Sequence, residues 1–277
     1  MPSLRSFTTF ASGLLSQIPL GNINSPTESP NALSYGHHCP ADSPLSCHNT
    51  TTAPDSCCFI YPGGQLLQTQ FWDASPAVGP DDSWTLHGLW YAYLAFFPTS
   101  EPPIVTLQPV QVTLLTTSPQ SRPDLCDGSY PTFCNAAPRH FDITQTLSAR
   151  KELYLLAYME KYWLPNSGSP ERFWQHEWNK HATCINTLSP SCYGDEWKKG
   201  DEVVDFFTRA VEVFKSLDTY QALATANILP STTATYTSDD IRGALQAITG
   251  KEVAIKCRGN QLNELELVTN PVSADFG

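Results

Sequence analysis

The stretch His-Glu-Trp-Asn-Lys-His at residues 176–181 places four ionisable side chains close together in the sequence. If it forms a helix turning by about 100° per residue, these side chains lie at about 0°, 100°, 40° and 140° around the axis. Two imidazoles, a carboxylate and an ammonium then converge on one face. The neighbouring aromatic residues indicate a half-buried cleft rather than a solvated surface. The ionisable residues are His176, Glu177, Lys180 and His181, and the aromatic ones are Phe173, Trp174 and Trp178.

A zinc site is the main competing interpretation of this stretch, because His-Glu-x-x-His on a helix binds zinc through histidines at i and i+4. Here Lys180 stands at i+4 from His176, and His181 stands at i+5. The two imidazoles therefore diverge, and a cation stands where the second ligand is needed. The sequence thus predicts no metal and no other cofactor.

Without a metal, this set of side chains suits displacement at phosphorus. A neutral imidazole removes a proton from the attacking oxygen, an imidazolium protonates the leaving oxygen, and a cation stabilises the charge that develops. The reaction needs another histidine, and the best candidate is His87 within Trp-Thr-Leu-His-Gly-Leu-Trp at residues 84–90. We expect a strand there, with tryptophans able to stack on nucleobases. The alternative is a structural histidine in a β core.

Composition limits the class of protein. The 277 residues carry a formal net charge of -11, and 41% of them are hydrophobic. A basic protein that coats nucleic acid is excluded, as is a largely disordered chain. No run of apolar residues is long enough for a membrane span.

Cysteine usage indicates an oxidising compartment. Nine cysteines accompany only two methionines and 23 prolines, which predicts disulfides and a secreted or vacuolar protein. The odd count leaves at least one cysteine without a partner in the chain. Asn49 begins an Asn-Thr-Thr glycosylation sequon. Residues 1–35 are interpreted as a signal peptide and leader, with a disordered tail as the alternative.

The order of predicted elements favours the α+β class, because strands and helices are grouped rather than strictly alternating. We expect a helix capped by Ser148 that runs to Trp163, and others over 171–183, from Asp201, and from Ser238 to Gly250. The predicted strands cover residues 65–72, 84–90, 253–257 and 264–268.

Two motifs resemble the active-site motifs of the ribonuclease T2 family, especially its fungal members. They are residues 84–90 and the stretch His-Glu-Trp-Asn-Lys-His-Ala-Thr-Cys at 176–184. Thr-Gln-Phe-Trp-Asp at 69–73 and Pro-Asp-Leu-Cys-Asp-Gly-Ser-Tyr at 123–130 support the resemblance. It implies a single catalytic domain over residues 36–277, with a central antiparallel sheet packed by several helices and pinned by disulfides.

The resemblance also implies an activity, metal-independent endonucleolytic cleavage of single-stranded RNA. The 2'-hydroxyl attacks the adjacent phosphate to leave a 2',3'-cyclic phosphate, which is then hydrolysed to a 3'-phosphate. DNA lacks that hydroxyl and is not a substrate. A monomer with no membrane attachment and an acidic working pH are expected.

Individual roles follow from the family pattern. His181 is the general base, His87 the general acid and His176 a phosphate ligand, while Glu177 and Lys180 stabilise the pentacovalent state. Trp90, Asp124 and Tyr130 match the first base pocket, and Gln70 and Phe173 line the second. The implied disulfides are Cys39–Cys58, Cys47–Cys126, Cys57–Cys192 and Cys134–Cys184, which leaves Cys257 unpaired.

Three departures from the family pattern stand out. Ala182 replaces a glycine after the last catalytic histidine, a change that a helical backbone tolerates. Residues 91–122 form an insert beside Trp90, interpreted as a translated intron rather than a lid loop, because so long an unstructured insert is uncommon in compact domains. The C-terminal segment is atypical and truncated after about residue 265. The alternative function is a catalytically silent secreted RNA-binding or effector protein of the same fold.

Overall fold

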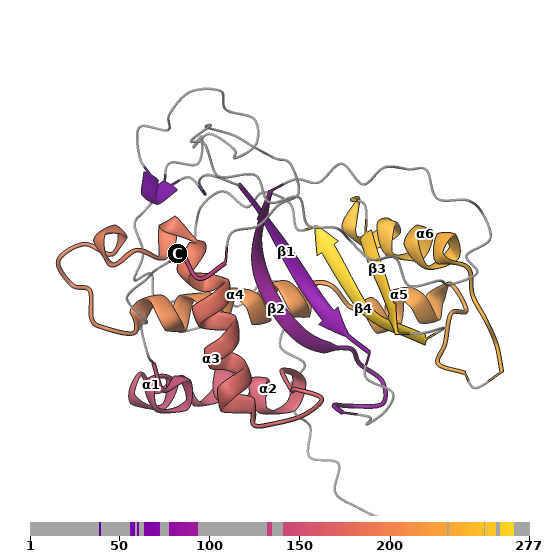
Figure 1. The fold of residues 1–277 in the computed structure, drawn as a ribbon, viewed down its shortest axis with the longest axis horizontal. Coiled ribbons are helices and arrows are strands. Elements are labelled where there is room, and N and C mark those ends of the chain that lie inside the picture. Colours follow the sequence, from indigo (N-terminus) through magenta and orange to yellow (C-terminus); the bar gives the residue numbers. More distant parts are fainter. Residues whose placement is uncertain are drawn as a thin grey trace, which may run out of the picture. The chain divides into compact units, whose positions relative to one another are not determined.

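The described part of the chain is built on an antiparallel sheet of four strands in the order β2-β1-β4-β3 (Figure 1). All four predicted strands are confirmed, and the last begins three residues earlier than expected. The bounds are β1 Gly64–Phe71, β2 Thr85–Tyr93, β3 Val253–Arg258 and β4 Gln261–Val268.

The structure is a computed structural model that describes residues 39, 56–58, 60, 64–72, 78–93, 132–134, 141–231, 233–251, 253–258 and 261–268. All of them belong to the unit Ser34–Gly277. Several expectations therefore lie outside the described residues. They concern the leader at 1–35, Asn49, the pair Cys47–Cys126, Asp124, Tyr130, most of the insert and the residues after 268.

A β-bulge interrupts the pairing of β1 with β2 at His87. Thr69 pairs with Gly88 and Gln70 with Leu86, so His87 is the extra residue on β2. Under strict alternation His87 and Gly88 would face opposite sides of the sheet. The bulge instead allows both to face the same side.

The opposite face of the sheet belongs to the hydrophobic core. Leu86, Leu89, Leu265 and Leu267 are fully buried there, and the long helix α4, Asp201–Ser216, contacts both β1 and β2. Figure 1 shows α4 crossing behind these strands. The sheet therefore has one face packed on the core and one face that carries His87.

Helices account for most of the remaining described chain. Those predicted from Asp201 and from Ser238 to Gly250 are confirmed, the latter ending at Gly250 with φ 64°. Two short helices, α1 and α5, were not predicted, because seven residues show too little periodicity. The bounds are α1 Ile143–Ala149, α2 Leu153–Tyr162, α3 Pro170–Lys180, α5 Thr219–Thr225 and α6 Ser238–Thr249, with short 3₁₀ turns η1 Ser56–Cys58, η2 Ala182–Cys184, η3 Asn186–Leu188 and η4 Pro190–Cys192.

Two predicted helix boundaries were wrong. Ser148 does not cap a helix but lies in the last turn of α1, whose N-cap is Asp142. Lys151 then takes a left-handed conformation, φ 66°, and α2 begins after Glu152. The helix expected to reach Thr183 ends at Lys180, because the chain tightens into η2.

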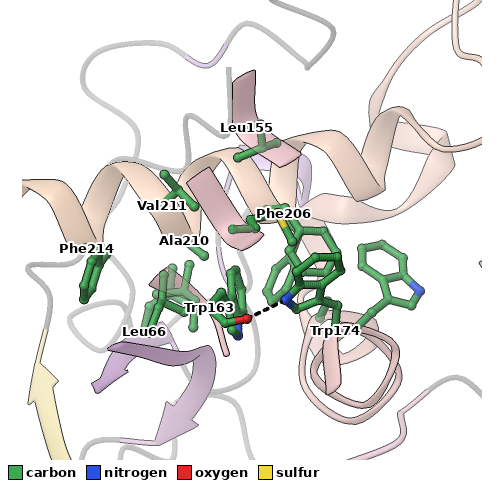
Figure 2. Close-up of a cluster of buried hydrophobic side chains, with 14 of the residues drawn as sticks. Leu66, Leu155, Trp163, Trp174, Phe206, Ala210, Val211 and Phe214 are labelled. Atoms are coloured by element: carbon green, nitrogen blue, oxygen red, sulfur yellow. Dashed lines mark hydrogen bonds between the residues drawn. The ribbon is translucent and has the colours of Figure 1, made fainter. Parts of the chain in front are cut away.

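Tryptophan side chains connect the core to the strand that carries His87. The Trp163 indole donates a hydrogen bond of 2.7 Å to the backbone carbonyl of His87, and the Trp174 indole donates one of 2.9 Å to the carbonyl of Trp163. Both side chains are buried beside Phe206 of α4 (Figure 2). The backbone at His87 is thus tied to the helical layer through two hydrogen bonds in series.

Three disulfides are present in the described residues, and they match the pairs that the resemblance implies. Cys57–Cys192 and Cys134–Cys184 close loops of 135 and 50 residues, while Cys39–Cys58 closes one of 19. Cys257 has no disulfide partner and is exposed.

The segment 91–122 begins inside the sheet. Its first three residues continue β2, pairing in register with residues 64–66 of β1. The boundary expected after Trp90 therefore does not coincide with the end of a strand.

Candidate active site

His87 lies where the open face of the sheet meets α3. Its Nδ1 is 3.2 Å from Oε2 of Glu264 on β4, and its Nε2 is 3.6 Å from Oε1 of Glu177 on α3. The ring stacks on Phe71 at a centroid distance of 3.9 Å. His87 is therefore held between two carboxyl groups from different layers of the fold.

Glu177 is fully buried beneath this contact. Its Oε2 accepts a hydrogen bond of 2.8 Å from the Trp90 indole. Gly88 makes this contact possible, because a Cβ at that position would lie 2.2 Å from Glu177 Oε2 and 2.5 Å from Trp90 Nε1. The glycine of the first motif thus lets the second motif approach the strand.

His181 occupies the C-cap of α3, where the helix gives way to η2. Its ring stacks on Trp90 at a centroid distance of 4.7 Å, with the planes 11° apart, and its Nε2 is 3.9 Å from Glu177 Oε2. Ala182 follows with a buried methyl group, and it is not among the described non-glycine residues with positive φ. A helical conformation therefore accommodates alanine here, as expected.

Burial lowers the pKa of both histidines, but their charged neighbours differ. Burial, together with the nearby charges of Lys180, His87 and His176, lowers the pKa of His181 to about 2. Burial also lowers the pKa of His87, but the hydrogen bond and charge of Glu264 oppose that effect. His181 is thus kept neutral, while a carboxylate favours the protonated form of His87.

Burial raises the pKa of Glu177 to about 8, although the Trp90 hydrogen bond and Lys180 partly oppose the increase. Lys180 stands close enough to lower the pKa of all three site histidines. Its ammonium lies 6.0 Å from the centre of the Trp90 ring. The centre of the site therefore combines a protonated carboxyl group with an ammonium.

His176 and Phe173 lie at the margin of this arrangement. The exposed ring of His176 meets Phe133 edge-on at 6.2 Å, and partial burial together with Lys180 lowers its pKa. Phe173 is half-buried, with its ring 5.6 Å from that of His87. Of the five predicted catalytic side chains, four meet at the centre and His176 faces outward.

Comparison with known proteins identifies the family. A sequence model of the ribonuclease T2 family matches residues 117–276. Ribonuclease Trv of Hypocrea rufa is 45% identical over 227 residues, which cover 82% of each chain. Ribonuclease T2 of Aspergillus oryzae is also 45% identical, over 82% of this chain and 71% of its own. The chain belongs to the ribonuclease T2 family.

A solved structure agrees with this assignment. The crystal structure of Actibind, a T2 ribonuclease, superposes with a TM-score of 0.69 at 42% identity, covering 84% of this chain and 85% of that one. The α+β fold with its antiparallel sheet is therefore that of a T2 ribonuclease, and the protein is an endoribonuclease.

Two of the residues expected to bind bases in this T2 ribonuclease, Gln70 and Trp90, are buried. Gln70 is fully buried, pairs across the sheet with the core residues Leu86 and Leu265, and donates its amide to Gln68. Trp90 is only 6% exposed and stacks on His181. Neither side chain offers an open surface to a base in this structure, because each is packed against protein groups.

The family motifs did not single out Glu264 and Lys256. Glu264 Oε1 accepts a hydrogen bond of 2.7 Å from Lys256, which is its cross-strand neighbour on β3. A signal was present in the sequence, because Glu264 and Glu266 alternate with Leu265 and Leu267 and so must face away from the core.

The described residues form neither a cluster suited to a metal ion nor a helix suited to a membrane span. No group of three or more His, Cys, Asp or Glu side chains is arranged there to hold a metal ion. No helix in the same residues is long and apolar enough to span a bilayer.

Proposed function

We propose that this ribonuclease cleaves single-stranded RNA by attack of the ribose 2'-hydroxyl on the adjacent phosphate. His181 accepts the hydroxyl proton as the bond from O2' to phosphorus forms. His87 donates a proton to O5' as the bond from phosphorus to O5' breaks. The products are a 2',3'-cyclic phosphate and a 5'-hydroxyl, and water then opens the cycle to a 3'-phosphate with the two histidines exchanging roles.

The observation that carries this proposal is the contrast between the two imidazoles. A general base must be neutral before the reaction and a general acid must be protonated. His181 is buried next to cations, whereas Nδ1 of His87 contacts the carboxylate of Glu264. Two identical side chains with divergent surroundings are what an acid–base pair requires.

The groups beside them support the same reaction. A buried Glu177 that is protonated at acidic pH can donate a hydrogen bond to a phosphoryl oxygen, whereas a carboxylate would repel it. Lys180 supplies the positive charge that stabilises the pentacovalent state. His176, exposed one helical turn from Lys180, is placed to contact a phosphate.

We further propose an acidic working pH. The sequence pI is about 4.9, so near that pH the net repulsion between protein and RNA vanishes while the phosphates remain anionic. The general acid must also stay protonated, and burial lowers the pKa of His87.

Disulfides and composition support a secreted or vacuolar protein, and we propose that it acts as a monomer and does not cleave DNA. Mass spectrometry of purified protein would test the cleavage of the leader and glycan addition at Asn49. Light scattering would test the monomer, and incubation with single-stranded DNA would test the substrate.

The segment 91–122 remains a proposed insert. The family model matches only from residue 117, within this segment, whereas three of its residues lie in β2. Sequencing cDNA across the junction tests the origin of the segment. If its codons persist in every transcript, the intron interpretation is wrong and a genuine loop remains.

The decisive experiment is digestion of RNA by the purified chain at about pH 5 in the presence of EDTA. Mass spectrometry then identifies the new ends. We expect cyclic phosphate ends that disappear in His87→Phe and His181→Phe, while EDTA has no effect. Activity lost in EDTA and restored by a metal ion would contradict the proposal.

A catalytically silent RNA-binding protein is the alternative function. It predicts a folded sample that binds RNA without producing new ends. The intact grouping of His87, Glu177, Lys180 and His181 favours catalysis. Deleting residues 91–122 from a silent but folded sample would show whether that segment blocks the site.

A further inference from the structure

Glu264 joins the acid histidine to a lysine at the edge of the sheet. One carboxylate oxygen faces His87 Nδ1 at 3.2 Å, and the other accepts a hydrogen bond of 2.7 Å from Lys256. Lys256 also pairs with Glu266 on the same strand as Glu264. Glu264 itself is buried, with 9% of its surface exposed.

The geometry identifies the reactive nitrogen of His87. An ionised carboxylate can only accept hydrogen bonds, so Nδ1 of His87 carries a proton in contact with Glu264. The other nitrogen, Nε2, faces Glu177 and the centre of the site. After Nε2 has given its proton to the leaving oxygen, the neutral ring still has Nδ1–H bound to Glu264. The contact therefore fixes one tautomer.

We propose that Glu264 is a positioning residue that holds His87 in the orientation and tautomer from which Nε2 delivers a proton, and that Lys256 holds the Glu264 carboxylate in place. This inference rests on the proposed role of His87 as general acid. It adds two residues from β3 and β4 to a site whose other members come from β2 and α3.

The charges around His87 agree with this arrangement. Burial by itself raises the pKa of Glu264, but hydrogen bonds with His87 and Lys256 outweigh it and hold that pKa below its ordinary value. Glu264 therefore stays ionised at the acidic pH proposed for the enzyme. The charged or titratable groups that influence or contact His87 are Glu177 and Lys180 of α3, His181 at its C-cap, Glu264 of β4 and Lys256 of β3.

Glu264 and Lys256 act on His87 with opposite sign. The carboxylate raises the pKa of the imidazole, and the ammonium lowers it. A general acid loses activity above its pKa, so the alkaline limb of the pH–rate profile depends on the pKa of His87 and therefore on both charges. Removing either charge must move that limb, and the two movements must be in opposite directions.

The test compares Glu264→Gln, Glu264→Ala and Lys256→Met in the full chain, with Arg258→Met as the matched control. Arg258 is an exposed cation on the same strand as Lys256. kcat and KM are measured against pH on a dinucleotide, and thermal unfolding verifies that each variant is folded.

Glu264→Ala is expected to lower kcat by about 10- to 100-fold with little change in KM, within the range for general acid–base groups. Glu264→Gln retains an acceptor for Nδ1–H and should recover most of the kcat at low pH, with its alkaline limb moved to lower pH. Lys256→Met should move that limb to higher pH, and Arg258→Met should leave it in place.

NMR titration of the His87 ring separates this inference from the proposed function, because it does not need catalysis. We expect Nδ1 to stay protonated in the neutral ring of the wild type, and Glu264→Gln to lower the pKa of His87. If RNA is not cleaved but these NMR results hold, the positioning role stands and the proposed function fails. The inference would be overturned if Glu264→Ala left the tautomer and the pKa of His87 unchanged. It would also be overturned if the alkaline limbs of the pH–rate profiles of Glu264→Gln and Lys256→Met moved in the same direction.

Discussion

The active site has one histidine on the sheet, His87, and one at the end of a helix, His181, and the two differ in their neighbours. On the sheet, His87 meets Glu264 through Nδ1, and Glu264 is tied to Lys256. On the helix side, His181 packs flat on Trp90 close to Lys180. Both imidazoles are buried, but the sheet places the negative charge of Glu264 beside His87, whereas the helix end places positive charge beside His181.

This difference teaches that the acid and the base are specified by the elements that carry them. On β2, His87 lies on the face of the sheet that carries Glu264 of β4. The end of α3 places His181 one turn from Glu177 and next to Lys180. Neither assignment depends on the histidine itself, so each can be altered through its neighbours.

The largest expected effect is on kcat when each histidine is replaced in turn. Each variant is assayed on RNA and on a substrate with a different leaving group. On RNA, both His87→Ala and His181→Ala should lower kcat by about 10²- to 10⁴-fold. On a nucleoside 3'-(para-nitrophenyl phosphate), the leaving group needs no proton. There His87→Ala should retain most activity, and His181→Ala should remain impaired.

Kinetics on both substrates at one pH checks this prediction, with circular dichroism to confirm folding. Equal losses in both variants on the activated substrate would break the distinction between an acid side and a base side. A loss confined to His181→Ala would sharpen it.

The second prediction concerns the contact between the two sides at Gly88. A methyl group there would lie 2.2 Å from Glu177 Oε2, so Gly88→Ala must separate strand and helix or break the Trp90 hydrogen bond. We expect kcat to fall by about 10-fold or more and the free energy of unfolding to fall by about 1–3 kcal/mol. Urea unfolding and steady-state kinetics measure both effects. Gly243→Ala, in a helix with open space around it, is the control and should not lower either quantity.

The third prediction uses pH to test the burial of the helix side. Glu177 has a pKa of about 8 in the folded protein, above its ordinary value. The stability that it contributes is therefore fully present below about pH 4 and is lost as the pH rises through about 8. Burial also raises the pKa of Asp205 on α4, to about 7, so Asp205 changes the free energy of unfolding with pH in the same direction as Glu177.

Urea unfolding between these pH values should show that these two carboxyl groups contribute a downward slope to the free energy of unfolding, of up to about 1.4 kcal/mol per pH unit for each proton involved. The buried His181, whose pKa is lowered, contributes an upward slope below about pH 6.5, so the variants are compared with the wild type at each pH. Glu177→Gln should flatten part of the downward slope and Asp205→Asn another part. Glu160→Gln, exposed on α2, should leave it unchanged. A slope that is the same in all variants would contradict the assigned protonation of Glu177.

The smallest expected effects come from replacing Trp163 and Trp174, two tryptophans whose hydrogen bonds connect the sheet to the helices. Trp163→Phe and Trp174→Phe each remove one buried hydrogen bond, and each should lower the free energy of unfolding by about 1–3 kcal/mol. Only Trp163 bonds to the His87 backbone, so only Trp163→Phe should also lower kcat. A matching loss of kcat in Trp174→Phe would show that the effect is general destabilisation.

Much of the fold could be predicted from the sequence where a local pattern was long or well capped. The strand around His87 and the helices after Asp201 and Ser238 were predicted correctly. Helix α1 was missed because it has only seven residues, and α3 ended early because the tight turn at His181 is set by tertiary contacts. The pairing of Glu264 with His87 depends on strand order, which no local pattern reveals.

The candidate site shows the same division. Spacing along a helix predicted that Glu177 and Lys180 lie together, but it did not predict that His176 would face outward. Spacing could not show that the Trp90 ring would stack on His181 and that its indole would donate a hydrogen bond to Glu177. Both contacts depend on how closely β2 approaches α3 at Gly88. The burial of Gln70 likewise depends on the sheet, because Gln70 pairs with the core residues Leu86 and Leu265.

The position of β4 in the sheet has a consequence for biosynthesis. This strand is the last described in the chain, yet it lies between β1 and β3, and its Glu264 is 177 residues from His87. A growing polypeptide on the ribosome has His87, Glu177 and His181 well before it has β4. We therefore expect the catalytic centre to be complete only after β4 has been synthesised and has paired with β1.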